Sequence, residues 1–577
     1  MFFVMLSWFA QLLLWSGIGW LIYARLFRLN SGEGWCARDF FHSCWTGFGA
    51  LVAVAQIYAL FFPIKGLFLV MAAGAAAPGL WLQFRAWRRR PTGTPTSARW
   101  QVLLFWTLLM LCALRLGAGL GWLEWTGAYD SDLYHFGIVR WAKEYPTVPG
   151  LANLHAPLGF NSTYLLYAAI VDHGLWYREA AWVVPGVFVI LFTAQLLWTL
   201  LCDHAALRRT KIFSLLLLAF AALLICDTIP CLYYDRPAAL FLCLALLELS
   251  QLAPATAARQ EMLRSLFMIL LLVAVSVSIK PIAFAAAALL GAWALWLTWR
   301  WTPRWLWLRL WLFPVLLAGG MLTRNVVLSG WLFYPTPYGR LPVQWAMPTQ
   351  LDPDVPDKAM HSVSAGYLMA RAWARLPGPA HKQALAGGPW LQLWWQRNCH
   401  AMEIKLLAGG LLCLVLALLV GQRREPPGWL PYAALVSGTV VLLWFLAAPD
   451  LRFGEGFIWL WFAVTGAWLL TRWPASHWTL AAAGALALTA LLLAQPHWRW
   501  PEKIGWWNIG HAQVANYHRV TLNNGQQPPL TVLAPDHDDR MGDAPLPHTP
   551  YPFDGISCRV PGSLRHGFFI ALPATQP

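Results

Sequence analysis

Charged residues are scarce in this sequence of 577 residues. Asp, Glu, Lys and Arg make up 12% of the chain, against about 25% in a typical soluble domain. This scarcity excludes a cytosolic soluble enzyme. Hydrophobic residues reach 59%, and the mean hydropathy is +0.51. A disordered chain is excluded as well, because 39 Trp, 30 Phe and 16 Tyr could not all stay solvated.

Several sequence signatures are also missing. The ten cysteines form no CxxC pair and no His/Cys spacing of a zinc site, and most lie inside apolar runs. We therefore interpret them as small core residues. The first apolar run, residues 2–23, has no basic segment before it and no small-residue cleavage site, so we expect a retained helix and not a signal peptide.

Long apolar runs are what the chain has instead. Each is long enough for roughly 20 residues of helix across a hydrocarbon layer about 30 Å thick. We predict an all-α polytopic membrane protein with about fourteen transmembrane helices, at 3–24, 44–62, 66–84, 101–123, 180–201, 212–230, 237–255, 265–280, 282–299, 305–323, 402–421, 429–447, 456–471 and 476–494. Residues 1–494 then form a transmembrane domain with outer loops at about 124–179 and 325–400. Residues 495–577 form a small tail domain, in which "LTVLAPD" predicts a strand.

The net charge of +15 comes from short basic clusters between the apolar runs. They form no single stripe, which argues against nucleic-acid binding. The positive-inside rule assigns them to the cytoplasm, which requires outside termini and an even number of spans. The loops and the tail then face the periplasm or exterior. The clusters comprise Arg25, Arg28, Arg38, Arg85, Arg88, Arg89, Arg90, Arg99, Arg208, Arg209, Lys211, Arg259, Arg264, Arg300, Arg304, Arg423, Arg424 and Arg472.

The first candidate for chemistry is the segment "GAYDSDLYHFGIVRW", which offers Asp130, Asp132, His135 and Arg140. Carboxylates at a membrane interface are costly unless they are paired or used. A carboxylate beside an acceptor hydroxyl can take its proton during sugar transfer, and oxygen ligands at i and i+2 can hold Mg²⁺ or Mn²⁺. The alternative is a solvated loop in which Asp130 caps the next helix.

Four further clusters have structural explanations when taken singly: a helix cap, a snorkelling lysine, a helix-end anchor and an internal ion pair. The topology nevertheless places all five clusters on one membrane face. We therefore predict one outward-opening cavity with carboxylates for acid–base chemistry and cations for an anionic group. The four clusters are Asp235 with Arg236, Lys280, Arg324 with Asn325, and Asp450 with Arg452 and Glu455.

The outward carboxylate, the "DRPAALF" turn and the later "IKP" resemble the GT-C superfamily of integral-membrane glycosyltransferases, including its protein mannosyltransferase and lipid A aminoarabinose transferase branches. More closely, the chain is similar to one family of mostly uncharacterised bacterial polytopic membrane proteins. The motifs that carry this likeness, from about residue 120 to the end, are "YDSDLYHFGIVRW", "VPGLANLHAPLGFNS", "RNVVLSGWLFYP", "APDLRFG" and "DAPLPHTPYP".

The resemblance implies a polyprenyl-phosphate-sugar donor, a glycan, lipid or protein acceptor, and transfer at the periplasmic face of a bacterial inner membrane. It implies a catalytic carboxylate in the first outer loop, which is Asp130 by position, and Asp132 completes a modified DxD. Two departures stand out: "NLHAPLGF" lacks a basic residue after its His, and His548 stands where a Cys is expected, which argues against a disulfide at Cys558. The predicted substrate-binding residues are Arg140, His155, Asn161, Asp235, Arg236, Lys280, Arg324, Asn325, Asp450 and Arg452.

The hypothesis that follows is a lipid-linked donor whose phosphate is held by Lys280 and Arg324 while Asp130 deprotonates the acceptor hydroxyl. Direct displacement would invert the anomeric carbon. Mg²⁺ or Mn²⁺ at Asp130 and Asp132 is the one cofactor under consideration, and His135 completes the catalytic set.

Three alternatives remain. A polysaccharide polymerase or ligase would use a diphosphate-linked lipid and rely more on outer arginines. A transporter is disfavoured by cytoplasmic helix halves that look nearly charge-free. A non-catalytic scaffold would tolerate single substitutions in the cavity. His155 and Asn161 also have plain readings, as a hydrogen-bonded loop histidine and as loop structure.

Overall fold

A computed structural model describes the chain except for residues 28–36, 89–97, 123–127, 253–258, 302–303, 352–356, 358–359, 421–428, 473–476, 495–503 and 572–577. The described part is mostly helical, and its strands all lie in the C-terminal tail.

Twelve of the described helices are long and apolar enough to cross a membrane. They are α1 (Phe2–Leu26), α2 (Ala37–Phe61), α3 (Gly66–Arg88), α4 (Arg99–Leu120), α7 (Ala180–Leu201), α8 (Arg208–Asp227), α10 (Arg259–Ile279), α11 (Phe284–Trp301), α12 (Arg304–Ser329), α16 (Met402–Leu419), α17 (Leu430–Ala447) and α18 (Leu451–Thr471). The multi-pass, all-α membrane architecture is therefore confirmed.

Two further helices occupy the other predicted span positions but are shorter. Helix α9 (Asp235–Gln251) has 17 residues, and the apolar part of α19 (His477–Ala494) covers Thr479–Leu493. The count of fourteen spans thus stays a prediction. Helix α12 runs to Ser329, past its predicted end at residue 323. Arg324 and Asn325 consequently belong to this helix and not to the following loop.

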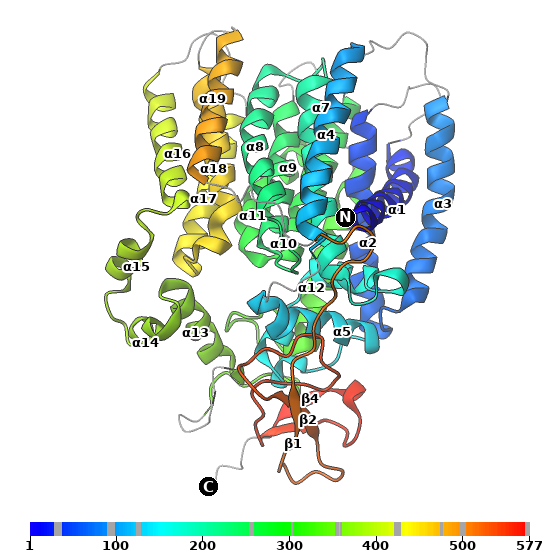
Figure 1. The fold of residues 1–577 in the computed structure, drawn as a ribbon, viewed down its shortest axis with the longest axis vertical. Helices are drawn as coiled ribbons and strands as arrows, with labels where there is room; N and C mark the ends of the chain where they lie inside the picture. The colour runs from blue at the N-terminus through cyan, green and yellow to red at the C-terminus, as the bar shows by residue number, and fades with distance from the viewer. Residues whose placement is uncertain are drawn as a thin grey trace.

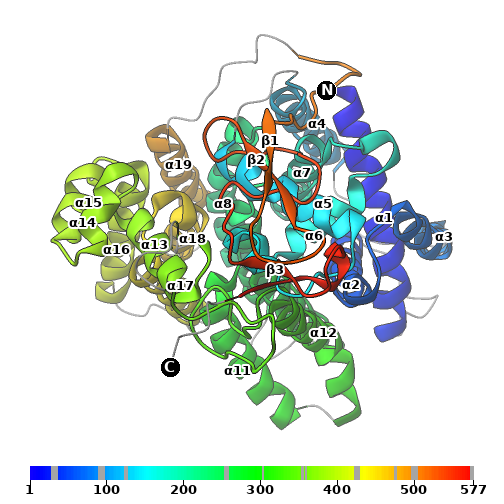
Figure 2. The same ribbon diagram turned by 90° about the horizontal axis from the view of Figure 1, so that it is seen from below.

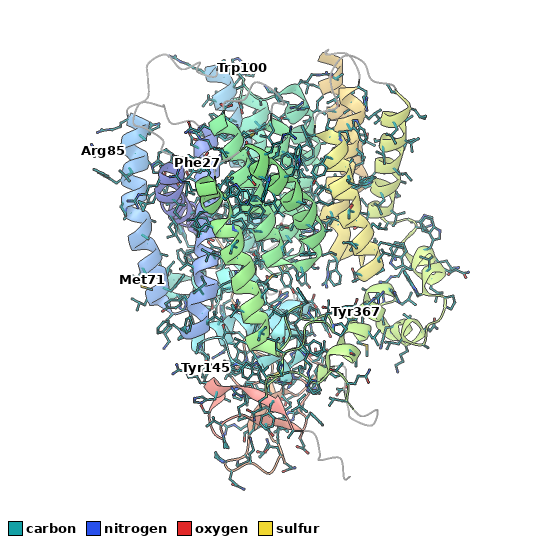
Figure 3. All side chains as sticks on the ribbon, turned by 180° about the vertical axis from the view of Figure 1, so that it is seen from behind. Phe27, Met71, Arg85, Trp100, Tyr145 and Tyr367 are labelled. Atoms are coloured by element: carbon teal, nitrogen blue, oxygen red, sulfur yellow. The ribbon has the colours of Figure 1, made fainter. Side chains whose placement is uncertain are left out.

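The bundle has two different ends (Figure 1). The N-terminal amine of Met1 donates to the carbonyl oxygen of Trp506 at 3.1 Å, so α1 begins beside the tail and ends away from it. We call the end that carries the tail the tail face and the opposite end the basic face. Figure 3 shows Arg85 and Trp100 toward the basic face and Tyr145 and Tyr367 toward the tail face.

The described basic clusters lie at helix ends on the basic face, as the charge pattern predicted. Arg25 is in the last turn of α1, Arg85 and Arg88 are in the last turn of α3, and Arg300 is in the last turn of α11. Arg28, Arg89, Arg90, Arg423 and Arg424 lie outside the described residues.

Small residues bring the first helices into close contact. A Cβ added at Gly19 would lie 1.7 Å from the Ser43 carbonyl oxygen, and one at Gly47 would lie 1.9 Å from that of Trp15. Such close approach of backbones is how membrane helices pack without a hydrophobic driving force between them. Beside this crossing, the rings of Trp15, Phe48 and Phe188 pack with centroids 5.0–5.1 Å apart.

The tail face is built from short elements between and after the long helices (Figure 2). The first outer segment contains α5 (Phe136–Glu144) and α6 (Thr163–Val171), and the second contains α13 (Val363–Arg375), α14 (His381–Leu385) and α15 (Trp390–Asn398). In the tail, β1 (Tyr517–Thr521) pairs antiparallel with β2 (Thr531–Pro535), and β3 (Ile556–Cys558) with β4 (Phe568–Ile570). The predicted "LTVLAPD" strand is β2.

Candidate active site

Asp130 forms an ion pair with Arg452 on the tail face, although 322 positions separate them in the chain. Asp130 Oδ2 lies 2.7 Å from Arg452 Nη2, and the side chains are 19% and 40% exposed. Burial raises the pKa of Asp130, Arg452 lowers it, and the charge of Asp235 raises it. The pKa is raised on balance, so the carboxylate is a stronger base than a solvated aspartate.

The local sequence holds both partners in place. The Asp450 carboxylate caps α18 by accepting a hydrogen bond from the Arg452 amide at 2.9 Å. On the other side, Ser131 opens a one-turn π-helix (Ser131–His135), and its hydroxyl accepts from the Leu232 amide at 3.0 Å. Asp130 itself makes no capping bond to this turn, so its carboxylate stays available to Arg452.

A second ion pair joins Lys280 to Asp235. Asp235 is the first residue of α9, and Lys280 follows the end of α10. The ring of Phe453 lies beside both cations, 4.0 Å from Lys280 Nζ and 4.9 Å from the Arg452 guanidinium carbon. We call Asp130, Asp235, Lys280 and Arg452 the tail-face charge cluster.

Arg236, the neighbour of Asp235, forms an ion pair that links two helices. Its guanidinium donates to both carboxylate oxygens of Glu455, at 2.7 and 3.1 Å. This bidentate pair ties α9 to α18 beside the tail-face charge cluster. The predicted substrate-binding residue Arg236 is therefore occupied by Glu455, and Asp450 serves as a helix cap.

His135 is buried behind the cluster and not paired with Asp130. Its Nδ1 lies 3.3 Å from the Ser131 hydroxyl, and its ring packs against Tyr134 and Tyr234 at centroid distances of 4.4 and 5.2 Å. Burial lowers its pKa well below the ordinary value, and the charges of Arg452 and Lys280 lower it further. The imidazole is thus neutral at pH 7, and a role for it in catalysis stays a prediction.

Arg324 and Asn161 meet each other away from this cluster. Arg324 Nη1 donates to Asn161 Oδ1 at 2.8 Å, and Arg324 Nε donates to the Thr147 hydroxyl at 3.3 Å. Arg324 and Ser162 line a narrow cavity of only about 20 Å³, and Lys280 is not among its lining residues. The two cations predicted to share one phosphate therefore have separate surroundings.

Three other predicted binding residues make contacts that organise the fold. Arg140 pairs with Glu144 at 2.7 Å and with Asp543 of the tail at 3.4 Å. His155 is buried. Asn325 Nδ2 donates to the Leu332 carbonyl oxygen at 2.9 Å and so closes the end of α12.

The two aspartates considered for a metal ion make different contacts. Asp130 faces Arg452, whereas the backbone carbonyl of Asp132 accepts hydrogen bonds from the tail. Within the described part of the chain, no group of three or more His, Cys, Asp or Glu side chains is arranged to hold a metal ion. A shared Mg²⁺ or Mn²⁺ at Asp130 and Asp132 stays a prediction, and we derive no catalytic step from one.

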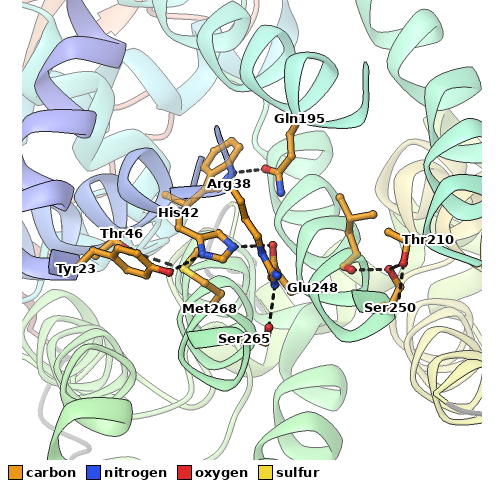
Figure 4. A network of polar contacts seen from close by, with 12 residues as sticks. Tyr23, Arg38, His42, Thr46, Gln195, Thr210, Glu248, Ser250, Ser265 and Met268 are labelled. Carbon is orange, nitrogen blue, oxygen red and sulfur yellow. Dashed lines mark hydrogen bonds and ion pairs between the residues drawn. The ribbon is translucent and has the colours of Figure 1, made fainter. Parts of the chain in front are cut away.

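A second network of charged groups joins the start of α2 to the end of α9, toward the basic face. Figure 4 shows its contacts. Glu248 Oε1 is 2.9 Å from His42 Nε2, and Glu248 Oε2 is 2.9 Å from Arg38 Nη2. Tyr23 Oη lies 2.9 Å from His42 Nδ1, and Arg38 donates to Ser265. We call these residues the basic-face charge cluster. The expectation that this half of the bundle is nearly charge-free is wrong, because Glu248 stands within an apolar helix and pairs with Arg38 and His42.

Some functional candidates were missed from sequence. Phe453 and Tyr233, whose ring centroid lies 5.0 Å from the Arg452 guanidinium carbon, stand next to predicted residues and carry no signal of their own. The tail residues Asp539 and Asp543 reach Tyr129 and Arg140. A carboxylate-rich stretch in a tail is ordinary surface composition, so only tertiary structure identifies these contacts.

Residues 1–459 match the family model described as "Domain of unknown function (DUF8201)". The chain belongs to the DUF8201 family. Its match spans α1 to the first half of α18 and so includes every member of the tail-face charge cluster. No curated protein and no solved structure matches the chain.

Proposed function

We propose that this protein is a membrane glycosyltransferase of the GT-C type. It moves a sugar from a polyprenyl-phosphate donor to a glycan, lipid or protein acceptor, in a bacterial inner membrane, on the periplasmic side. The observation that carries the proposal is the tail-face charge cluster. A half-buried carboxylate, Asp130, pairs with Arg452 at the edge of the predicted membrane region. Lys280 pairs with Asp235 beside the same Phe453 ring, and its charge also acts on Asp130.

The chemistry needs a base and an anion site close together. The acceptor oxygen forms a bond to the anomeric carbon while the bond from that carbon to the phosphate oxygen breaks, and its electron pair leaves with the phosphate. The acceptor proton passes to Asp130. Negative charge grows on the leaving phosphate, so Arg452 and Lys280 stabilise the transition state. Attack opposite the leaving group inverts the anomeric carbon.

The ion pair between Asp130 and Arg452 gives this scheme an order of events. In the free protein Arg452 forms an ion pair with Asp130, and its charge lowers the pKa of that carboxyl. A donor phosphate offers Arg452 a second anion, and bidentate binding to phosphate suits a guanidinium. When Arg452 binds the phosphate instead of Asp130, its lowering effect on the pKa of Asp130 is lost. The pKa then rises further, because the effect of burial remains. The base is therefore strongest when the donor is bound.

A polysaccharide polymerase or ligase is the second candidate, because Arg452 is the most exposed member of the two mapped ion pairs and lies over two aromatic rings. Such an enzyme would take a diphosphate-linked lipid. Charge reversal, Arg452→Glu, would then cost more activity than Asp130→Asn. The glycosyltransferase scheme requires both changes to be severe.

The test is release of polyprenyl phosphate from polyprenyl-phosphate-linked hexoses by the purified chain in lipid nanodiscs. Wild type should release it in the presence of an acceptor extract, and Asp130→Asn should be slower by about 10²–10⁴-fold, the usual worth of a general base. Asp536→Asn is the matched control, because Asp536 pairs with His518 inside the tail. Full activity of Asp130→Asn would remove Asp130 from the mechanism.

A further inference from the structure

The C-terminal tail lies against the segment that carries Asp130. The Met541 and Gly542 amides both donate to the Asp132 carbonyl oxygen, at 3.0 and 2.8 Å. The tail thus satisfies the backbone two residues after Asp130.

A side-chain contact joins the same two segments on the other side of Asp130. Tyr129 directly precedes Asp130, and its hydroxyl donates to Asp539 Oδ2 at 2.5 Å. The Tyr551 hydroxyl donates to the same oxygen at 3.0 Å. Asp130 is therefore bracketed by tail contacts at residues 129 and 132.

Asp543 fixes the next helix of the segment. It lies 3.4 Å from Arg140 Nη1 and 2.9 Å from Arg178 Nε. Its backbone carbonyl also accepts from Arg140 Nη1 at 2.8 Å. Helix α5, which continues the π-turn, is consequently held to the tail by a charged side chain that both arginines share.

The tail can hold the Asp130 segment because the tail is itself hydrogen-bonded to the first outer segment. The Phe568 amide donates to the Pro149 carbonyl oxygen at 2.9 Å, and the Thr549 hydroxyl donates to that of Leu154 at 2.9 Å. A Cβ added at Gly137 would lie 2.9 Å from His548 Nε2, so the two surfaces are in direct contact. Because of these contacts, the tail packs directly against the segment that contains Asp130.

We propose that the tail, through Asp539, Met541, Gly542 and Asp543, is a positioning element that keeps Asp130 facing Arg452. It touches neither reacting atom and acts through residues 129, 132 and 140. The inference rests on the proposed catalytic role of Asp130 for its meaning, but the geometry can be tested without any substrate.

The test measures the Asp130 segment in the full-length protein in nanodiscs. Two variants weaken the contacts, Tyr129→Phe mildly and Asp543→Asn more strongly, and Asp536→Asn is the matched tail control. Amide hydrogen exchange of residues 128–144 is followed by mass spectrometry, and a hydrophobic carbodiimide reports access to Asp130. The carbodiimide readout is specific, since a loss of stability alone would not single out this carboxylate.

We expect Asp543→Asn to raise exchange in residues 128–144 by about tenfold or more, the scale of a lost charged hydrogen bond, and to speed labelling of Asp130. Exchange in α9 and α18 should stay unchanged, and Tyr129→Phe should act in the same direction but less. Unchanged labelling of Asp130 in both variants would overturn the proposal, and so would equal acceleration of exchange throughout the bundle. Failure of the proposed function is a different result, namely full sugar transfer by Asp130→Asn.

Discussion

Helix α9 carries one carboxylate of each charge cluster, Asp235 at its start and Glu248 near its end, and the two clusters differ in exposure. Glu248 and His42 are each 1% exposed, and both carboxylate oxygens of Glu248 have a nitrogen partner at 2.9 Å, one on His42 and one on Arg38. Asp130 and Arg452 are 19% and 40% exposed. The carboxylate at the centre of the basic-face charge cluster is therefore closed to solvent, with Arg38, 34% exposed, at the open edge of its network. Asp130 and Arg452 are both partly open, so this pair can exchange a partner for a ligand.

This comparison separates stability from activity. A buried, fully paired network costs much when it is broken, because an unpaired charge is left in a low-dielectric interior. A half-open pair costs little to break, since water reaches the groups left behind. Substitutions in the tail-face charge cluster should consequently lower activity more than stability, and substitutions in the basic-face charge cluster should lower stability more than activity.

The largest expected effect is on catalysis in the tail-face charge cluster. Lys280→Met should lower the rate of sugar transfer by roughly 10²–10³-fold, because the leaving phosphate loses a preorganised cation. The initial rate of polyprenyl phosphate release measures this. Lys405→Met, at an exposed position of α16, is the control and should keep the wild-type rate. Equal rates for the two variants would take Lys280 out of the anion site.

The basic-face charge cluster should show the reverse. Glu248→Ala should lower the free energy of unfolding by about 3 kcal/mol, at the lower end of the range for broken buried pairs because Arg38 is one-third exposed. Unfolding in mixed micelles with increasing denaturing detergent measures this. Folded Glu248→Ala should transfer sugar at a near-normal rate. A stable but inactive variant would instead assign this cluster to function.

Acidic pH should loosen the tail face through buried histidines. Burial lowers the pKa of His155 to about 3 and the pKa values of His361 and His548 to about 4. In the unfolded chain these groups titrate near the ordinary value of about 6.5. The stability they contribute is thus complete above about pH 6.5 and falls as the pH drops toward about 4.

The size of this effect is about 1 kcal/mol per histidine between pH 7 and 5.5. Hydrogen exchange of the tail strands at the two pH values measures it, with His548→Gln as the comparison. The variant should lose about one third of the pH dependence. An identical pH profile in the variant would show that His548 is not protonated on opening.

The smallest expected effect concerns the ion pair between Arg236 of α9 and Glu455 of α18. Arg236→Lys keeps the charge but loses the bidentate geometry with Glu455. We expect a loss of about 1 kcal/mol in the free energy of unfolding, with the rate of sugar transfer reduced by less than about tenfold. Thermal unfolding followed by tryptophan fluorescence checks the first value. A loss of activity as large as that of Lys280→Met would place Arg236 in the substrate site.

Hydrophobic runs and basic clusters were enough to predict where the helices lie in the chain and which helix ends share a face of the bundle. The reason is that membrane insertion depends on local composition. They also predicted that Asp130, Asp235, Lys280 and Arg452 share one face. Which charges pair could not be predicted, since Asp130 and Arg452 meet only through tertiary packing. The acidic residue inside the apolar stretch "LALLELSQ" was a readable sign of Glu248 and its partners.

The most direct test of the half-open cluster is its affinity for polyprenyl phosphate alone, measured in nanodiscs for wild type, Arg452→Ala and Glu248→Gln. Wild type and Glu248→Gln should bind with the same Kd, and Arg452→Ala should bind at least about tenfold more weakly, the scale of one lost charged contact. Equal binding by wild type and Arg452→Ala would contradict the assignment of this cluster as the phosphate site.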